Sequence, residues 1–227
     1  MGAMIEFASN GSTEVGYLAT PADGEGPGVV VIQEWWGLVD HIKQVCDRFA
    51  AEGFVALAPD LYHGAKTTEP DEAAKTMMAL RLDRAGKDMS GAVDALLARS
   101  VGTGVGVVGF CMGGGLALML ASQRPDRVRA VVPFYGVVPW EGSQPDYSAL
   151  GAAVLGHYAE NDESANPEAV RALERTLRDA GNSDVEFHIY PGADHAFFND
   201  TRPEVYDREA SALAWERTVQ FLRDRIG

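Results

Sequence analysis

The run from Val105 to Ser122 constrains the fold of this chain more than any other segment. An apolar stretch, Val105–Phe110, leads directly into Gly109-Phe110-Cys111-Met112-Gly113 and then into a helix-forming tail. This pattern predicts a buried strand that turns sharply into a helix, and the glycines on either side of Cys111 relieve the crowding of such a turn. Cys111 then lies before a helix N-terminus, whose amide dipoles favour the thiolate, the reactive form of cysteine.

Apolar runs and helical patterns alternate along the rest of the chain. The alternation predicts an α/β fold with a mostly parallel central sheet and helices on both faces. Buried strands are expected at 28–33, 54–59, 105–110, 130–135, 153–158 and 185–190. Helices are expected at 41–52, 71–99, 114–122, 168–180 and 204–226. Asp40 is expected to cap the first helix and Gly86 to break the second, while residues 4–8 and 14–19 are expected to pair as an antiparallel edge.

Length and composition predict one α/β hydrolase-sized domain over residues 1–227, without a separate cap domain. Met1-Gly2-Ala3 is interpreted as a cloning remnant outside the fold. The net charge of -14 argues against nucleic acid or an anionic membrane as partner. We expect a cytoplasmic monomer or weak homodimer, because no membrane span or signal peptide is evident and the two cysteines, Cys46 and Cys111, make no disulfide framework.

Three residues follow one another in the order that α/β hydrolases use for nucleophile, acid and histidine: Cys111, Asp162 and His195. Each comes just after an apolar run, where the carboxyl ends of parallel strands form ligand sites. Alternatives remain open. Cys111 can instead be a small buried residue of the core, and His195 can be a turn residue that bonds to nearby backbone. Glu160 or Glu163 can take the acid role in place of Asp162.

Another strand end, Gln33-Glu34-Trp35-Trp36-Gly37, sets a carboxylate beside two large aromatic rings. In hydrolases of this fold, the loop after this strand supplies one amide of the oxyanion hole. Glu34 is equally compatible with a helix cap or a solvent-facing position. Aromatic residues at this and other strand ends are expected to line an apolar pocket, with some of them in the core. Met77 and Met78 are expected to pack in the core rather than in that pocket.

These motifs together resemble the dienelactone hydrolase family over nearly the whole chain. The resemblance rests on Gln33-Glu34-Trp35-Trp36-Gly37, Ala58-Pro59-Asp60-Leu61-Tyr62, Gly109-Phe110-Cys111-Met112-Gly113-Gly114, Asp162 before Asn166-Pro167, and Tyr190-Pro191-Gly192-Ala193-Asp194-His195-Ala196-Phe197. It implies that Cys111 attacks an ester or lactone carbonyl, that His195 transfers protons and that Asp162 orients the imidazole, through an acyl-enzyme intermediate.

The resemblance also implies roles around the triad. The backbone amides of Trp35 and Met112 would hold the oxyanion, and Glu34 would take the thiol proton when substrate binds. No cofactor is implied, and no grouping of histidine, cysteine and carboxylates along the sequence has metal-ligand spacing. The residues expected to contact a small ester or lactone substrate are Trp36, Tyr62, Tyr135, Phe197, Phe198 and Asn199.

The chain departs from the family at the arginines that bind a substrate carboxylate. Asn199 stands where one of them is expected, and Glu69–Asp71 contains none, although Arg81 or Arg202 can approach from elsewhere in the chain. Losing a charge-assisted pair disfavours an anionic substrate, so we expect a neutral or activated ester. Two alternatives remain: a ligand sensor without catalysis, and a thiol redox enzyme using Cys111 but lacking a Cys-x-x-Cys pair.

Overall fold

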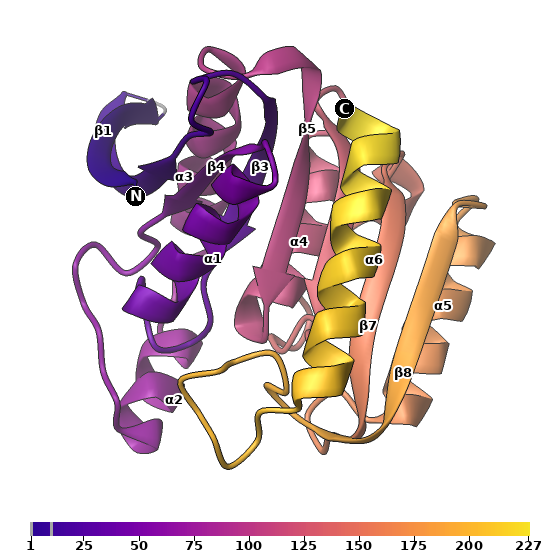
Figure 1. Ribbon diagram of the computed structural model, residues 1–227. Helices are drawn as coiled ribbons and strands as arrows, with labels where there is room; N and C mark the ends of the chain where they lie inside the picture. The colour runs from indigo at the N-terminus through magenta and orange to yellow at the C-terminus, as the bar shows by residue number, and fades with distance from the viewer. Residues whose placement is uncertain (1, 10) are drawn as a thin grey trace.

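Eight strands form one sheet in the order β1-β2-β4-β3-β5-β6-β7-β8 (Figure 1). The computed structural model describes residues 2–9 and 11–227. The strands are β1 (Ala3–Ser9), β2 (Ser12–Ala19), β3 (Pro27–Ile32), β4 (Val55–Pro59), β5 (Val101–Phe110), β6 (Val128–Phe134), β7 (Ala153–Asn161) and β8 (Val185–Asp194). β1 and β2 pair antiparallel, β2 joins β4 antiparallel, and all other neighbours are parallel.

Helices cover both faces of the sheet (Figure 1). They are α1 (Asp40–Ala51), α2 (Pro70–Met78), α3 (Leu82–Leu97), α4 (Met112–Gln123), α5 (Pro167–Asp179) and α6 (Arg208–Ile226). α1 and α6 lie on one face, and α3, α4 and α5 lie on the other. Among the helices that the structure describes, none combines the length and the apolar character needed to cross a membrane.

The two faces explain why the central strands are apolar throughout. In β3, Val30 and Ile32 pack toward α3 and α4, whereas Val29 and Val31 pack toward α1 and α6. Side chains alternate across a strand, so a strand covered on both faces has no position left for a polar residue. The expected α/β fold, with its mostly parallel sheet and antiparallel edge, is confirmed.

Four local expectations differ from the structure. Gly86 lies inside α3, and the break before that helix comes instead at residues 79–81. Asp40 is the first residue of α1, whose N-cap is Val39.

The ends of the chain differ as well. α6 begins at Arg208, and the preceding Asp207 accepts hydrogen bonds from amides of its first turn. Ala3 belongs to β1, and the Gly2 amide donates to Asp47 Oδ1 at 2.8 Å, so these two residues are part of the fold.

Candidate active site

The turn between β5 and α4 holds Cys111 in a conformation that L-residues rarely adopt. Its φ is +54° and its ψ is -121°, so the thiol projects from a sharp strand-to-helix turn. Gly113 must lack a side chain because a Cβ there would lie 2.5 Å from the carbonyl oxygens of Ile32 and Gln33. A Cβ on Gly109 would collide with the carbonyl of Gly113. The Gly-x-Cys-x-Gly pattern therefore follows directly from the close packing of this turn.

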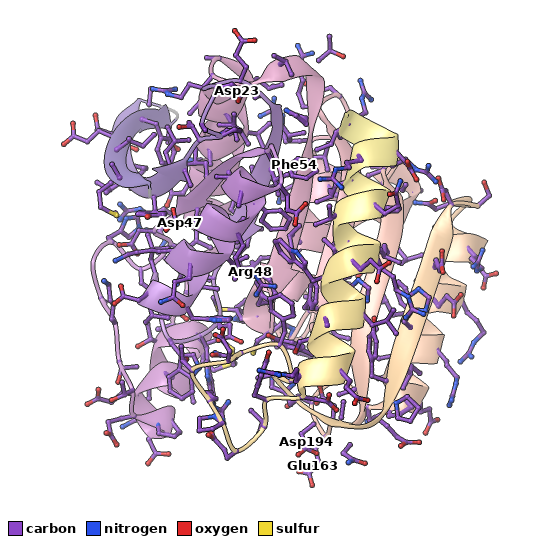
Figure 2. The ribbon with its side chains drawn as sticks, in the orientation of Figure 1. Asp23, Asp47, Arg48, Phe54, Glu163 and Asp194 are labelled. Carbon is purple, nitrogen blue, oxygen red and sulfur yellow. The ribbon has the colours of Figure 1, made fainter. Side chains whose placement is uncertain are left out.

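His195 and Asp162 form a short polar contact. Asp162 Oδ2 lies 2.6 Å from His195 Nδ1, and its other oxygen accepts hydrogen bonds from the amides of Ser164 and Ala165. Asp162 is buried, whereas Glu160 is exposed and accepts instead from the Gly192 amide. Of the acids left open by the sequence, Asp162 is the one that contacts His195. Asp194 and Glu163 lie at the same end of the sheet (Figure 2).

The environment of this pair favours an imidazolium beside a carboxylate. Burial opposes protonation of His195, but its interactions with Asp162 and Cys111 outweigh burial and raise its pKa to about 10. Burial likewise opposes ionisation of Asp162, yet the hydrogen bonds from His195 and from two backbone amides lower its pKa. These interactions favour the protonated form of His195, which can act as a proton donor to a leaving group.

Glu34 is buried and held by a side chain on each oxygen. Tyr135 donates from its hydroxyl to Oε1 at 3.2 Å, and Asn199 donates from Nδ2 to Oε2 at 2.7 Å. Burial, with Glu34 and Cys111 nearby, raises the pKa of Tyr135 and keeps it a neutral donor. Asn199 is itself oriented by Thr201, whose amide and hydroxyl both donate to Asn199 Oδ1. The alternatives of a helix cap or a solvent-facing Glu34 are therefore wrong.

A cavity of about 370 Å³ opens onto these groups at the carboxyl ends of the strands. Cys111, Glu34 and His195 line it, and the rest of its wall is mainly apolar. The remaining lining residues are Trp35, Trp36, Met77, Met112, Tyr135, Gly136, Val137, Pro139, Ser164, Ala165, Ala196 and Arg202. The backbone amides of Trp35 and Met112 donate no hydrogen bond to any other residue in the described part of the chain, so both are available to an oxyanion.

Comparisons with known proteins show the family to which the chain belongs. The family model of the dienelactone hydrolase family matches residues 15–226. The chain belongs to the dienelactone hydrolase family. Protein usf of Aquifex pyrophilus is 40% identical over 239 residues, with 100% of both chains covered. A protein of Aquifex aeolicus named "Putative carboxymethylenebutenolidase" is 37% identical over 231 residues, with 98% of each covered.

Solved structures of this family have the same fold. A protein of Klebsiella pneumoniae titled "Putative Dienelactone Hydrolase" superposes with a TM-score of 0.87 at 28% identity and covers 98% of this chain and 99% of its own. A dienelactone hydrolase-like promiscuous phosphotriesterase from metagenomic libraries has a TM-score of 0.87 at 26% identity, with 100% and 99% covered. This member of the dienelactone hydrolase family is thus a hydrolase with the α/β hydrolase fold.

Four residues expected to contact substrate lie outside the cavity of this dienelactone hydrolase family member. Phe197 and Phe198 are buried in the core that α1 and α6 cover, because the turn after β8 directs both rings inward. Arg48, labelled in Figure 2, comes from α1. Its guanidinium lies 4.9 Å from the Phe198 ring centroid. Tyr62 donates to Met112 Sδ at 3.2 Å from behind the turn, and Asn199 is occupied by Glu34.

The structure decides the place of Met77 and of Arg202, for which the sequence analysis gave different expectations. Met77, expected in the core, lines the cavity from the last turn of α2, whereas its neighbour Met78 is exposed. Arg202 also lines the cavity, and its guanidinium lies 5.9 Å from the Trp36 ring centroid while Nε donates to Glu204 Oε1 at 2.8 Å. Arg202 is thus one of the two arginines that the sequence offered as able to approach, whereas Arg81 lines a different groove.

Proposed function

We propose that this protein hydrolyses carboxylic esters or lactones with Cys111 as nucleophile, His195 as proton carrier and Asp162 as the residue that orients the imidazole. One observation carries the proposal. Cys111, in its strained turn, and His195, which contacts Asp162 at 2.6 Å, line the same cavity. A nucleophile, a base and a group that orients the base are the parts that acyl transfer needs.

The first half of the reaction forms a thioester. The sulfur of Cys111 attacks the carbonyl carbon, and the carbonyl electrons move to the oxygen, which accepts hydrogen bonds from the Trp35 and Met112 amides. When the carbonyl reforms, the bond to the leaving oxygen breaks and His195 donates its proton to that oxygen. The alcohol of an ester then leaves the site, whereas the new hydroxyl of an opened lactone stays attached to the acyl group on sulfur.

The second half restores the enzyme. Neutral His195 takes a proton from water, and the resulting hydroxide attacks the thioester carbonyl. Collapse of this second intermediate breaks the carbon–sulfur bond and frees the acid product, and the Cys111 thiolate that leaves takes back its proton from Glu34. Asp162 holds the same face of the imidazole throughout, because its second oxygen is fixed by the amides of Ser164 and Ala165.

Glu34 supports the resting state of the thiol in this proposal. Its carboxylate lines the cavity beside Cys111, and Tyr135 and Asn199 hold both of its oxygens. A proton transferred from Cys111 to Glu34 when substrate enters would generate the thiolate at the moment of attack. The resting thiol is then less exposed to oxidation than a permanent thiolate.

A neutral or activated ester fits the mainly apolar wall best, since aromatic and aliphatic side chains dominate it. Arg202 favours a second candidate, an anionic ester or lactone, because its guanidinium lies at the same cavity. The Arg202→Gln variant separates the two. We expect it to leave kcat/KM for a neutral ester within about threefold, whereas a loss of tenfold or more for an anionic ester alone would favour the second candidate. Arg171→Gln, on exposed α5, is the matched control.

The decisive experiment is pre-steady-state hydrolysis of p-nitrophenyl acetate with intact-mass detection of an acetylated protein. We expect a burst and an added acetyl group in the wild type, and neither in Cys111→Ala. Cys46→Ala is the control, because Cys46 is fully buried in α1 and burial raises the pKa of its thiol. Undiminished hydrolysis by Cys111→Ala would refute the proposal. Binding without turnover would support the sensor, and peroxide consumption without ester cleavage would support the redox enzyme.

A further inference from the structure

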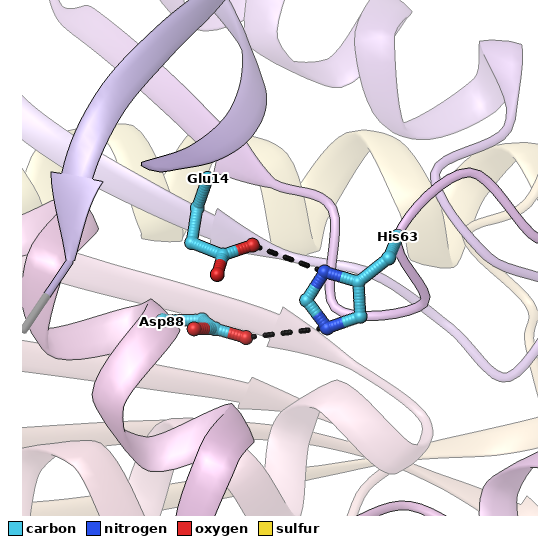
Figure 3. A group of neighbouring side chains, drawn as sticks. All are labelled: Glu14, His63 and Asp88. Atoms are coloured by element: carbon cyan, nitrogen blue, oxygen red, sulfur yellow. Dashed lines mark ion pairs between the residues drawn. The ribbon is translucent and has the colours of Figure 1, made fainter. Parts of the chain in front are cut away.

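Glu14, His63 and Asp88 meet on the α3 side of the sheet (Figure 3). Glu14 comes from β2, His63 from the loop after β4, and Asp88 from α3. His63 Nδ1 lies 3.0 Å from Glu14 Oε2, and His63 Nε2 lies 3.5 Å from Asp88 Oδ2. One possible ligand atom from each residue lies within 4.8 Å of the others. The fold therefore assembles a histidine and two carboxylates that are far apart along the chain.

The two carboxylates are buried, and one of them is incompletely satisfied. The side chains of Glu14 and Asp88 are 6% and 4% exposed. Asp88 Oδ2 accepts no hydrogen bond among the described residues, and it points toward the imidazole of His63 (Figure 3). A buried carboxylate oxygen without a donor is costly unless a cation compensates it. This oxygen lies 3.5 Å from His63 Nε2 and 3.9 Å from Arg84 Nε, and neither nitrogen donates a hydrogen bond to it.

We propose that Glu14, His63 and Asp88 form a binding site for a divalent transition-metal ion, with Zn²⁺ as the best match. Imidazole nitrogen and carboxylate oxygen are donors that Zn²⁺ accepts at about 2.0–2.2 Å. Two carboxylates balance its charge, and softer cations prefer thiolates, which are absent from this group. Three protein ligands leave one position of a tetrahedral ion open to water.

Access to this site comes from a neighbouring groove. His63 lines a groove of about 450 Å³ between the loop after β4 and the helices α2 and α3. The His63 side chain is 34% exposed, so water and ions reach its ring. Ion binding requires the three ligand atoms to close toward a common centre, and the imidazole is the most exposed of the three groups.

Arg84 competes with a metal ion for the carboxylates of Glu14 and Asp88. One guanidinium nitrogen lies 3.5 Å from Glu14 Oε1 and 3.4 Å from His63 Nδ1, and Nε lies 3.9 Å from Asp88 Oδ2. Its side chain is 52% exposed, so it can swing into solvent when an ion enters. Lys75 and Arg81 line the same groove, and they add positive charge that weakens metal binding at low salt.

The test measures Zn²⁺ binding by equilibrium dialysis and Zn²⁺-dependent melting of the full chain. Cys111→Ala serves as the background, since it removes the half-buried thiol of the cavity as a rival ligand. We expect one Zn²⁺ per chain, and a melting temperature higher by about 5 °C or more at a hundredfold excess over Kd. His63→Asn and Asp88→Asn should lose both effects. Asparagine suits position 63 because the φ of His63 is +51°.

His188→Asn is the matched control, because His188 Nε2 also lies 2.9 Å from a carboxylate, that of Glu186. This variant should bind Zn²⁺ as the background does. Absence of stoichiometric binding to the Cys111→Ala protein would overturn the proposal and leave the group as an ion-paired network. Binding that survives in folded His63→Asn would overturn it as well, because the ion would then lie elsewhere.

Discussion

Asn199 Nδ2 donates a hydrogen bond to Glu34 Oε2 at 2.7 Å, although 165 residues separate the two along the chain. The contact ties the loop after β8 to the strand end after β3 that carries Glu34 to the cavity. It also explains why an asparagine can stand where the dienelactone hydrolase family resemblance suggests an arginine. The Asn199 side-chain amide donates to the buried Glu34 carboxylate, so Asn199 is not available to bind a substrate carboxylate.

The contribution of this contact to stability is measurable with Asn199→Ala. The variant leaves one oxygen of a buried carboxylate without its donor, so we expect the free energy of unfolding to fall by about 1.5–3 kcal/mol. Urea unfolding followed by tryptophan fluorescence gives the value. Asn161→Ala, which removes a hydrogen bond at an exposed position, is the control and should cost about 1 kcal/mol or less. Equal losses of unfolding free energy in the two variants would mean that the buried contact stabilises the protein no more than the exposed one.

Asp162→Asn tests the orientation of the imidazole. An asparagine can keep the hydrogen bonds from Ser164 and Ala165, but its amide nitrogen would face His195 Nδ1 and favour the wrong tautomer. We expect kcat for a p-nitrophenyl ester to fall by about 10³–10⁴-fold, with the circular dichroism spectrum unchanged. Exposed Glu163→Gln should keep wild-type kcat. A similar kcat in Asp162→Asn and wild type would remove Asp162 from the triad.

His195 should make stability fall toward alkaline pH. Its pKa is raised from an ordinary value of 6.5 to about 10 in the folded protein. Because protonation is easier in the folded state, this contribution is complete below about pH 6.5 and is lost as the pH rises through about 10. We expect the free energy of unfolding to decline more steeply over this range in wild type than in His195→Gln. Parallel curves for the two proteins would contradict the raised pKa.

Gly113→Ala tests the packing of the turn that carries Cys111. A Cβ there would lie 2.5 Å from two backbone oxygens of the neighbouring strand end, and neither can move without displacing β3. We expect the free energy of unfolding to fall by about 3 kcal/mol. Gly151→Ala is the matched control, since a Cβ at Gly151 meets no atom within 4 Å. If both variants unfolded at the same urea concentration as wild type, the glycine requirement would be refuted.

Patterns within short segments predicted most of the fold. Burial on both faces makes β3 and its neighbours apolar throughout, and the sharp turn at Cys111 demands glycine at positions 109 and 113. Such features depend on a few adjacent residues, so they are visible without a structure. Gly86 misled the analysis for the same reason. A glycine usually weakens a helix, but Gly86 lies inside α3, where it packs against Gln123 of α4.

The sequence by itself determined the order of strands and helices, the turn that presents Cys111, and the order of Cys111, Asp162 and His195 along the chain. Tertiary structure alone decided which acid meets His195, that Phe198 points into the core, and that Arg202 reaches the cavity. The physical reason is that side-chain direction beyond a strand end depends on the register of neighbouring strands and on the path of loops, which contacts between distant segments set.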